Sequence, residues 1–257
     1  MNNYKYEEQS GRSMIEMLGV LAIIGVLSVG GIAGYSKAMN KFKTNKVADN
    51  VAMIVTNIRT LYAQQQNYSG LENLSAVQMG VVPDELITAT PTQGGTDGLQ
   101  NAFLGSVVIG AGKVSGLDGE SGTSTGANRG FYVIMNGLPK EACVTLATND
   151  WGSGYSSGLV GIVAAGAAQT ADSAGVQSIT CSGGSVTASS ASNNIGGNGT
   201  ALASANMELN ETPAPAPATP MAACVNGTTQ KTPMNVAEAA KACSSTANAN
   251  SILWKFY

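Results

Sequence analysis

The stretch SGRSMIEMLGVLAIIGVLSVGGIAG, residues 10–34, decides the fold of this chain. From residue 17 to residue 35 no side chain is charged. A helix rises 1.5 Å per residue, so these residues span about 30 Å, the thickness of the hydrocarbon core of a bilayer. A charge at the centre of a membrane helix costs roughly 2.5–3.5 kcal/mol on insertion scales. The segment can therefore cross a membrane, and the carboxylate of Glu16 at its start needs a separate reason.

The helix is predicted to continue past the apolar stretch, because no Pro or Gly follows before Gly70. Five apolar residues recur at steps of four and three and so share one face: Val47, Val51, Ile54, Ile58 and Leu61. The polar residues mostly lie off that face: Lys46, Asp49, Asn50, Asn57 and Thr60. The pattern predicts one helix from about residue 14 to residue 65, about 80 Å long, apolar in its first half and amphipathic in its second.

Beyond residue 67 short apolar runs alternate with loops. Four runs rich in β-branched or aromatic residues are predicted to be strands of one sheet: residues 106–110, 130–135, 158–164 and 251–257. Between them, Pro139 marks the start of a short helix, and Asn235 with Glu238 three residues later forms a capping-box variant that starts another. Both short helices carry a cysteine.

Residues 182–220 consist mostly of Ser, Gly, Ala, Asn and Thr and end in TPAPAPATP. Such a segment cannot bury enough apolar surface to order itself, and its Pro-rich end favours an extended chain. We interpret it as an exposed low-complexity insertion between Cys181 and Cys224.

Composition disfavours several classes of function. The chain of 257 residues has no histidine, the usual general base and transition-metal ligand, so we expect no enzyme, metal site or cofactor. The net charge is −3 and the sequence has no stripe of basic residues, so it offers no positively charged surface for the phosphates of a nucleic acid. The four cysteines form no C-x-x-C pair, which favours two disulfides in an oxidising compartment over zinc, with three pairings open.

Gly11, Glu16 five residues later, and an uncharged spanning helix together resemble the N-terminus of a type IV pilin precursor. The resemblance implies an α+β pilin fold in which the long N-terminal helix packs on an antiparallel sheet. It also implies that prepilin peptidase cuts after Gly11, that Arg12 becomes the methylated N-terminus, and that Glu16 is the family's hallmark acid. The implied domains are a leader at 1–11, a transmembrane and assembly half at 12–36, an amphipathic half at 37–66, and a globular domain at 67–257.

The implied cut explains why a carboxylate stands at position 16, at the start of the apolar helix. In a staggered stack of parallel helices, the carboxylate of Glu16 can meet the new α-amine of Arg12 in the neighbouring subunit. Alone, Glu16 can pair within its own helix with the Arg12 side chain, four residues back. The buried acid thus gains a partner between subunits through assembly.

The C-terminal half, from FYVIMNGLPKEACVTL to Cys243 near the end, resembles type IVb major pilins. That resemblance implies a Cys143–Cys243 disulfide and leaves Cys181–Cys224 to close the base of the insertion. It further implies a helical homopolymer, built by an inner-membrane platform and motor from a membrane-stored precursor and displayed outside the cell.

Other interpretations of the N-terminus stay open. A secretory signal peptide would show a basic start and a small-residue cleavage site, whereas residues 1–16 hold Lys5 and Arg12 against three acids. A plain anchor for a tethered binding domain explains the apolar length but not the spacing from Gly11 to Glu16. A type II secretion pseudopilin would share the N-terminus, although the exposed insertion favours a displayed fibre.

Overall fold

The structure is a computed structural model of the chain. It describes residues 14–65, 67–112, 114–115, 129–152, 157–166, 179–182, 185–187, 221–224 and 232–257. The chain divides into two compact units, Met1–Phe42 and Lys43–Tyr257. Most of the predicted insertion at 182–220, and the predicted leader at 1–11, lie outside the described residues.

Helix α1, Met14–Tyr62, is the continuous helix that the sequence predicts. It ends three residues before the predicted end at 65. In the first unit the described residues 14–42 belong entirely to this helix, and their side chains are almost all exposed. Burial begins at Thr44 and recurs to Tyr62, and the second unit starts at Lys43, within the amphipathic half.

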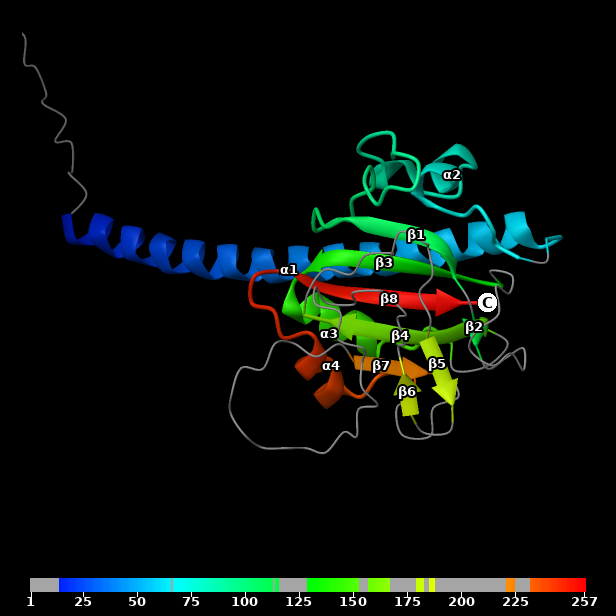
Figure 1. Cartoon of the computed structure of the whole chain (residues 1–257). Coiled ribbons are helices and arrows are strands. Elements are labelled where there is room, and N and C mark those ends of the chain that lie inside the picture. Colours follow the sequence, from blue (N-terminus) through cyan, green and yellow to red (C-terminus); the bar gives the residue numbers. More distant parts are fainter. Residues whose placement is uncertain are drawn as a thin grey trace, which may run out of the picture. The chain divides into compact units, whose positions relative to one another are not determined.

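The core of the second unit is a five-stranded sheet with the order β1-β3-β8-β4-β7 (Figure 1). Its strands are β1 Val107–Gly112, β3 Gly130–Leu138, β8 Asn250–Phe256, β4 Leu159–Ala165 and β7 Met221–Cys224. All neighbouring pairs are antiparallel. The predicted fold class and four predicted strands are confirmed, while β7 was not predicted because its sequence, MAAC, is too short to show a period.

A second, three-stranded sheet has the order β2-β5-β6. It consists of β2 Val114–Ser115, β5 Ile179–Ser182 and β6 Ser185–Thr187, with β2 and β5 parallel. The four predicted strands lie together in the five-stranded sheet, as predicted, whereas this second sheet was not predicted. Residues 185–187, which belong to the predicted insertion, pair with β5. Strands of two to four residues rich in Ser and Thr resemble a loop in sequence.

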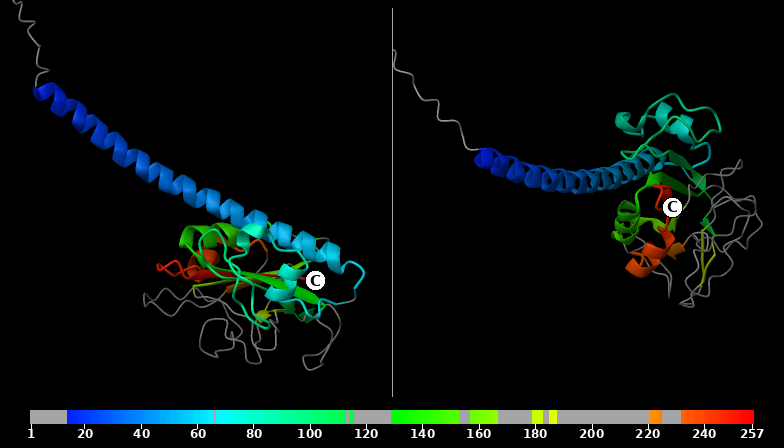
Figure 2. Two further views of the ribbon diagram at one scale, coloured as in Figure 1. Left: turned by 90° about the horizontal axis from the view of Figure 1, so that it is seen from above. Right: turned by 90° about the vertical axis from the view of Figure 1, so that its left-hand side faces the viewer.

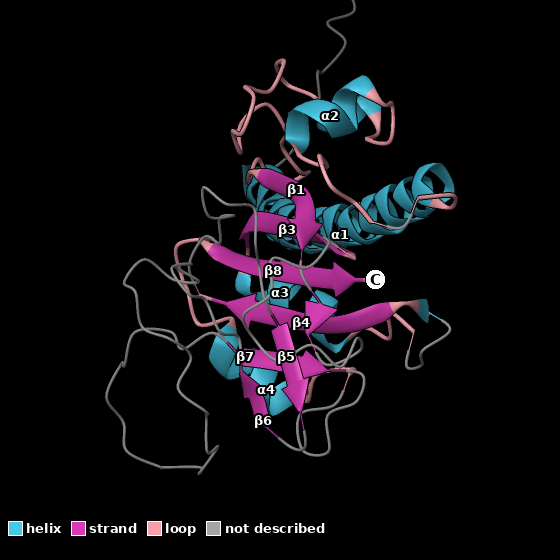
Figure 3. Cartoon of the chain, turned by 45° about the vertical axis from the view of Figure 1, so that its right-hand side comes forward, coloured by secondary structure: helices cyan, strands magenta, loops and turns pink. Residues whose placement is uncertain are grey.

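Helices cover one face of the large sheet (Figures 2 and 3). The buried part of α1 is joined there by α3, Lys140–Thr148, and α4, Val236–Ala242. Both short helices occur where the sequence predicts them. Asn235 caps α4 by accepting a hydrogen bond from the Ala237 N–H at 2.9 Å. Alternate residues of the sheet pack against these helices, including Val133, Ile162 and Trp254.

The predicted buried face of α1 needs two corrections. Leu61 is 46% exposed, whereas Val55 and Tyr62 are buried. The row of buried apolar residues shifts gradually round the helix, because 3.6 residues per turn do not match a strict repeat of four and three. Asn50, predicted to lie off the face, is buried. The reason is a second contact surface on α1, which the heptad-like pattern does not reveal.

That second surface is covered by residues 67–106, which contain α2, Asn73–Gln78, and the short 3-10 helix η1, Asp84–Leu86. Lys46 Nζ lies 2.7 Å from Glu85 Oε2, and the Asn57 side-chain amide donates to the Val81 carbonyl oxygen at 3.1 Å. Polar residues of α1 therefore hold this segment against the helix.

The same segment also closes the outer edge of the sheet at β1. Ile109 N–H donates to Asn73 Oδ1 at 2.8 Å, and Asn73 Nδ2 donates to the Val107 carbonyl oxygen at 3.0 Å. The Ala111 N–H donates to the Leu71 carbonyl oxygen at 3.0 Å. These bonds satisfy groups that would otherwise invite pairing with another chain.

Candidate assembly helix and disulfide-bonded domain

The apolar half of α1 can cross a membrane by length and composition. Its best 18-residue window has a mean hydropathy of 2.2, and none of that window is buried inside the protein. A core helix of a soluble protein is mostly buried, so this helix does not fit that class. Large side chains such as Leu21, Val26 and Ile32 are between 63% and 75% exposed. This half of α1 therefore presents apolar surface all round, without a partner among the described residues.

The glycines of this half meet no neighbouring atoms. A Cβ built at Gly30, Gly31 or Gly34 would have nothing within 4 Å apart from the helix itself and its chain neighbours. The fold of the single chain therefore does not require their small size. Small residues on a membrane helix do allow another helix backbone to approach closely.

Glu16 lies in the first turn of α1, where a carboxylate is favoured by the positive end of the helix dipole. Its side chain is exposed. Gly11 and Arg12 lie outside the described residues, so the cut after Gly11 and the pairing of Glu16 with Arg12 stay predictions.

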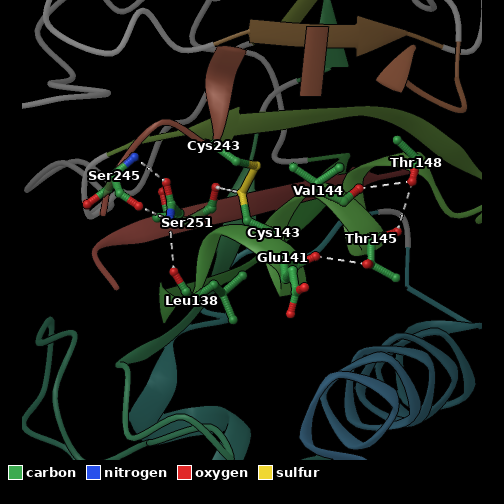
Figure 4. The surroundings of a disulfide bond; sticks show 10 residues. Leu138, Glu141, Cys143, Val144, Thr145, Thr148, Cys243, Ser245 and Ser251 are labelled. Atoms are coloured by element: carbon green, nitrogen blue, oxygen red, sulfur yellow. Dashed lines mark hydrogen bonds between the residues drawn. A yellow bond between two sulfur atoms is a disulfide. The ribbon is translucent and has the colours of Figure 1, made fainter. Parts of the chain in front are cut away.

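A disulfide joins Cys143 on α3 to Cys243 at the end of α4 (Figure 4). The two Cα atoms are 5.8 Å apart, the cysteines are separated by 100 positions in sequence, and both side chains are fully buried. The predicted pairing is confirmed. Because it closes a long loop, this bridge limits the unfolded chain and is worth about 4–5 kcal/mol in the chain-entropy model.

The disulfide packs against strand β8, next to a group of buried hydrogen bonds made by Asn250. Cys143 Sγ lies 4.0 Å from the Ser251 carbonyl oxygen, a packing contact, since a disulfide sulfur has no proton to donate. Next to it, Asn250 Nδ2 donates to the carbonyl oxygens of Leu138 and Ser245, both at 3.0 Å, and Asn250 Oδ1 accepts from the Ser245 N–H at 2.9 Å. Asn250 therefore links the end of β3 to the loop between α4 and β8.

Cys181 and Cys224 belong to β5 and β7, but their side chains lie outside the part of the chain that the structure describes. Their pairing stays a prediction. Within the described residues no group of three or more His, Cys, Asp or Glu could hold a metal ion. The structural asparagines Asn73 and Asn250 were missed, because a buried Asn between short apolar runs looks like a loop residue in sequence.

The model of the Bundlin family matches residues 36–210, which is more than half of the chain. The chain belongs to the Bundlin family. The match starts directly after the apolar stretch, so membership rests on the amphipathic half of α1 and on the domain. The family match and the pilus-subunit relatives confirm the resemblance to type IVb major pilins that the sequence shows.

The curated relatives of this Bundlin-family chain are pilus subunits by name. The major structural subunit of bundle-forming pilus from Escherichia coli O127:H6 is 28% identical over 62% of this chain and 75% of that protein. The toxin coregulated pilin of Vibrio cholerae serotype O1 is 26% identical over 55% of this chain and 58% of that protein.

A solved structure, the crystal structure of type IV b pilin from Salmonella typhi, aligns with a TM-score of 0.40 and 16% identity over 80% of this chain and 94% of that one. The fold rests on the elements described above.

Proposed function

We propose that this chain is the structural subunit of a type IVb pilus. Prepilin peptidase cuts it after Gly11, the apolar half of α1 holds the subunit in the inner membrane, and an assembly platform and motor move it into an extracellular helical filament. The role is structural and needs no catalytic residue, metal or cofactor. The observation that carries the proposal is an uninterrupted helix that is apolar and uncovered in one half and built into a Bundlin-family domain in the other.

The physical chemistry of the apolar half supports storage followed by assembly. In the membrane, lipid tails cover its side chains. In a filament, the same side chains of neighbouring helices cover one another, which stabilises the bundle by roughly 25 cal/mol per Å² of apolar surface removed from water. The unoccupied space around Gly30 and Gly34 fits close helix packing in that bundle.

The proposal predicts the N-terminus of the mature protein. Mass spectrometry of subunits in the membrane and in sheared surface fibres should give a first residue of Arg12, with a methylated amine. The spacing from Gly11 to Glu16 is the reason. An intact Met1, or a cut after Ala33 or Gly34, would show that the chain is not processed as a pilin.

Electron microscopy of the same sheared material decides between the proposal and its rivals. Long fibres that label with antibody against the domain support a pilus subunit. Short assemblies that stay with the cell envelope support a secretion pseudopilin. A processed chain that forms no polymer supports a tethered binding domain.

A further inference from the structure

The helical segment directly after the apolar stretch, residues 35–42, has two unlike faces. Tyr35 and Phe42 are 67% and 62% exposed and lie seven residues apart, so they share a face. Lys37 and Lys41 are exposed, lie one turn apart, and project from the opposite side of the helix. Aromatic rings with lysines beside them are typical of the layer in which a membrane helix meets water.

The next two lysines of α1, Lys43 and Lys46, differ from this pair because their side chains contact residues of the domain. Lys43 Nζ lies 5.7 Å from the centre of the Phe103 ring, and Lys46 forms the ion pair with Glu85. Neither Lys37 nor Lys41 has an ion pair within the described residues. Two of the four lysines therefore remain available to a partner outside the chain.

The rise of the helix determines how far Lys37 and Lys41 lie from the hydrocarbon core of the membrane. If Tyr35 marks the end of the hydrocarbon core, Lys37 lies about 3 Å and Lys41 about 9 Å beyond it along the axis. The headgroup layer of one leaflet is about 5–8 Å thick, and a lysine side chain can bend back several ångströms to reach it. Both ammonium groups can thus contact lipid phosphates, whereas Lys46, about 16 Å beyond, is too far.

We infer that Lys37 and Lys41 form a binding site for anionic phospholipid headgroups in the outer leaflet of the inner membrane. The inference rests on the proposed membrane storage of the subunit and names the lipid class that it requires. Lysines on the outer side oppose the usual preference for Lys and Arg on the cytoplasmic side. Pairing with phosphate compensates for that placement and fixes the depth of α1 before extraction.

Native mass spectrometry of the full chain in detergent, titrated with phosphatidylglycerol or phosphatidylcholine, tests the inference. The wild-type chain should retain phosphatidylglycerol in preference to phosphatidylcholine. The double variant Lys37→Gln/Lys41→Gln should bind phosphatidylglycerol about 25-fold less tightly, since each lysine near an anionic surface contributes about fivefold. Lys37→Arg/Lys41→Arg should keep the preference.

The matched control is Lys140→Gln/Lys241→Gln, which removes the same charge from exposed positions of the domain and should change nothing. Equal lipid retention by the Lys37/Lys41 double Gln variant, or no lipid preference in the wild type, would overturn the inference. So would unchanged lipid binding combined with lost fibres, which would make a second copy the partner. Flotation with phosphatidylcholine vesicles tests the proposed function separately: all variants should float, and a wild-type chain that fails to float refutes membrane storage itself.

Discussion

At Leu104 the backbone adopts φ = 65°, the left-handed region that glycine occupies more readily. The surrounding loop fixes this conformation. Asn101 Oδ1 accepts from the N–H groups of Phe103 at 2.8 Å and Gly105 at 3.2 Å, and Asn101 Nδ2 donates to the Asn136 carbonyl oxygen at 2.7 Å. The Leu104 side chain is 79% exposed, so it has little packing with which to offset the strain. Of the described residues outside glycine, only Asn248 shares a positive φ.

Leu104→Gly should therefore stabilise the protein. Relief of left-handed strain is worth about 1–2 kcal/mol, and the greater freedom of glycine in the unfolded chain removes part of it, which leaves about 0.5–1 kcal/mol. Urea unfolding of the full chain in detergent measures the difference. Leu104→Ala is the control: it shortens the same side chain but keeps the strain, so its stability should stay close to that of the wild type. A Gly variant less stable than the Ala variant would contradict the argument.

Among the secondary-structure elements, β8 shows most clearly what sequence patterns reveal and what they miss. The alternation in SILWKFY predicts a strand with Ile252, Trp254 and Phe256 on one side, and the structure confirms it. The pattern gives no sign that Lys255, on the other side, is 0% exposed. Periodicity identifies the face against α1, but the burial of the second face depends on contacts from distant parts of the chain.

Lys255 gives the stability of the fold a predictable pH dependence. Burial lowers the pKa of Lys255 to about 7 from its usual 10.5. Between these values the unfolded chain holds a proton that the folded chain lacks, so stability rises as the pH increases from 7 to about 10.5. Lys255→Met should remove this rise and increase the melting temperature at pH 7. The control is the exposed Lys140→Met, which should keep the wild-type pH profile; an unchanged slope in Lys255→Met would contradict the assignment.

The helices show the same difference between features that the sequence reveals and features that it does not. Pro139 and the Asn235 cap place α3 and α4 correctly, because start signals are local and depend on a few side chains. The second contact surface of α1 was not predictable, since Lys46 and Asn57 are polar and bind the loop segment through specific partners rather than through an apolar stripe. Local signals in sequence locate elements, whereas polar contacts between them become visible once the chain is folded.

For the whole molecule, one helix serves two environments. Residues 43–62 pack one side of the helix into a domain that contains a buried disulfide, and residues 14–42 offer uncovered apolar surface. The sequence predicted an apolar half and an amphipathic half of this helix, because hydropathy along a helix is readable without tertiary contacts. It also predicted the Cys143–Cys243 bridge through the resemblance to type IVb pilins, since spacing alone left three pairings open.

Assembly of the whole molecule gives Glu16 its expected role. If Glu16 were a tolerated charge at the membrane edge, Glu16→Gln would be neutral or would improve insertion, because a desolvation cost disappears. If Glu16 meets the α-amine of Arg12 in the neighbouring subunit, the Gln variant leaves that amine buried without a countercharge, which costs about 3–5 kcal/mol. We expect the Gln variant to be processed and membrane-inserted normally but to yield fewer fibres by a factor of ten or more, roughly.

The measurement compares cleaved subunit in the membrane with polymer in the sheared fraction. Glu16→Asp, shorter by one methylene, should yield an intermediate amount of fibre, because its carboxylate keeps the charge but reaches the amine less well. Glu141→Gln, a change of the same kind at an exposed position of α3, should assemble like the wild type. Normal fibre yield from Glu16→Gln would mean that pairing with the incoming amine does not guide assembly, and that the apolar surfaces of the helices suffice.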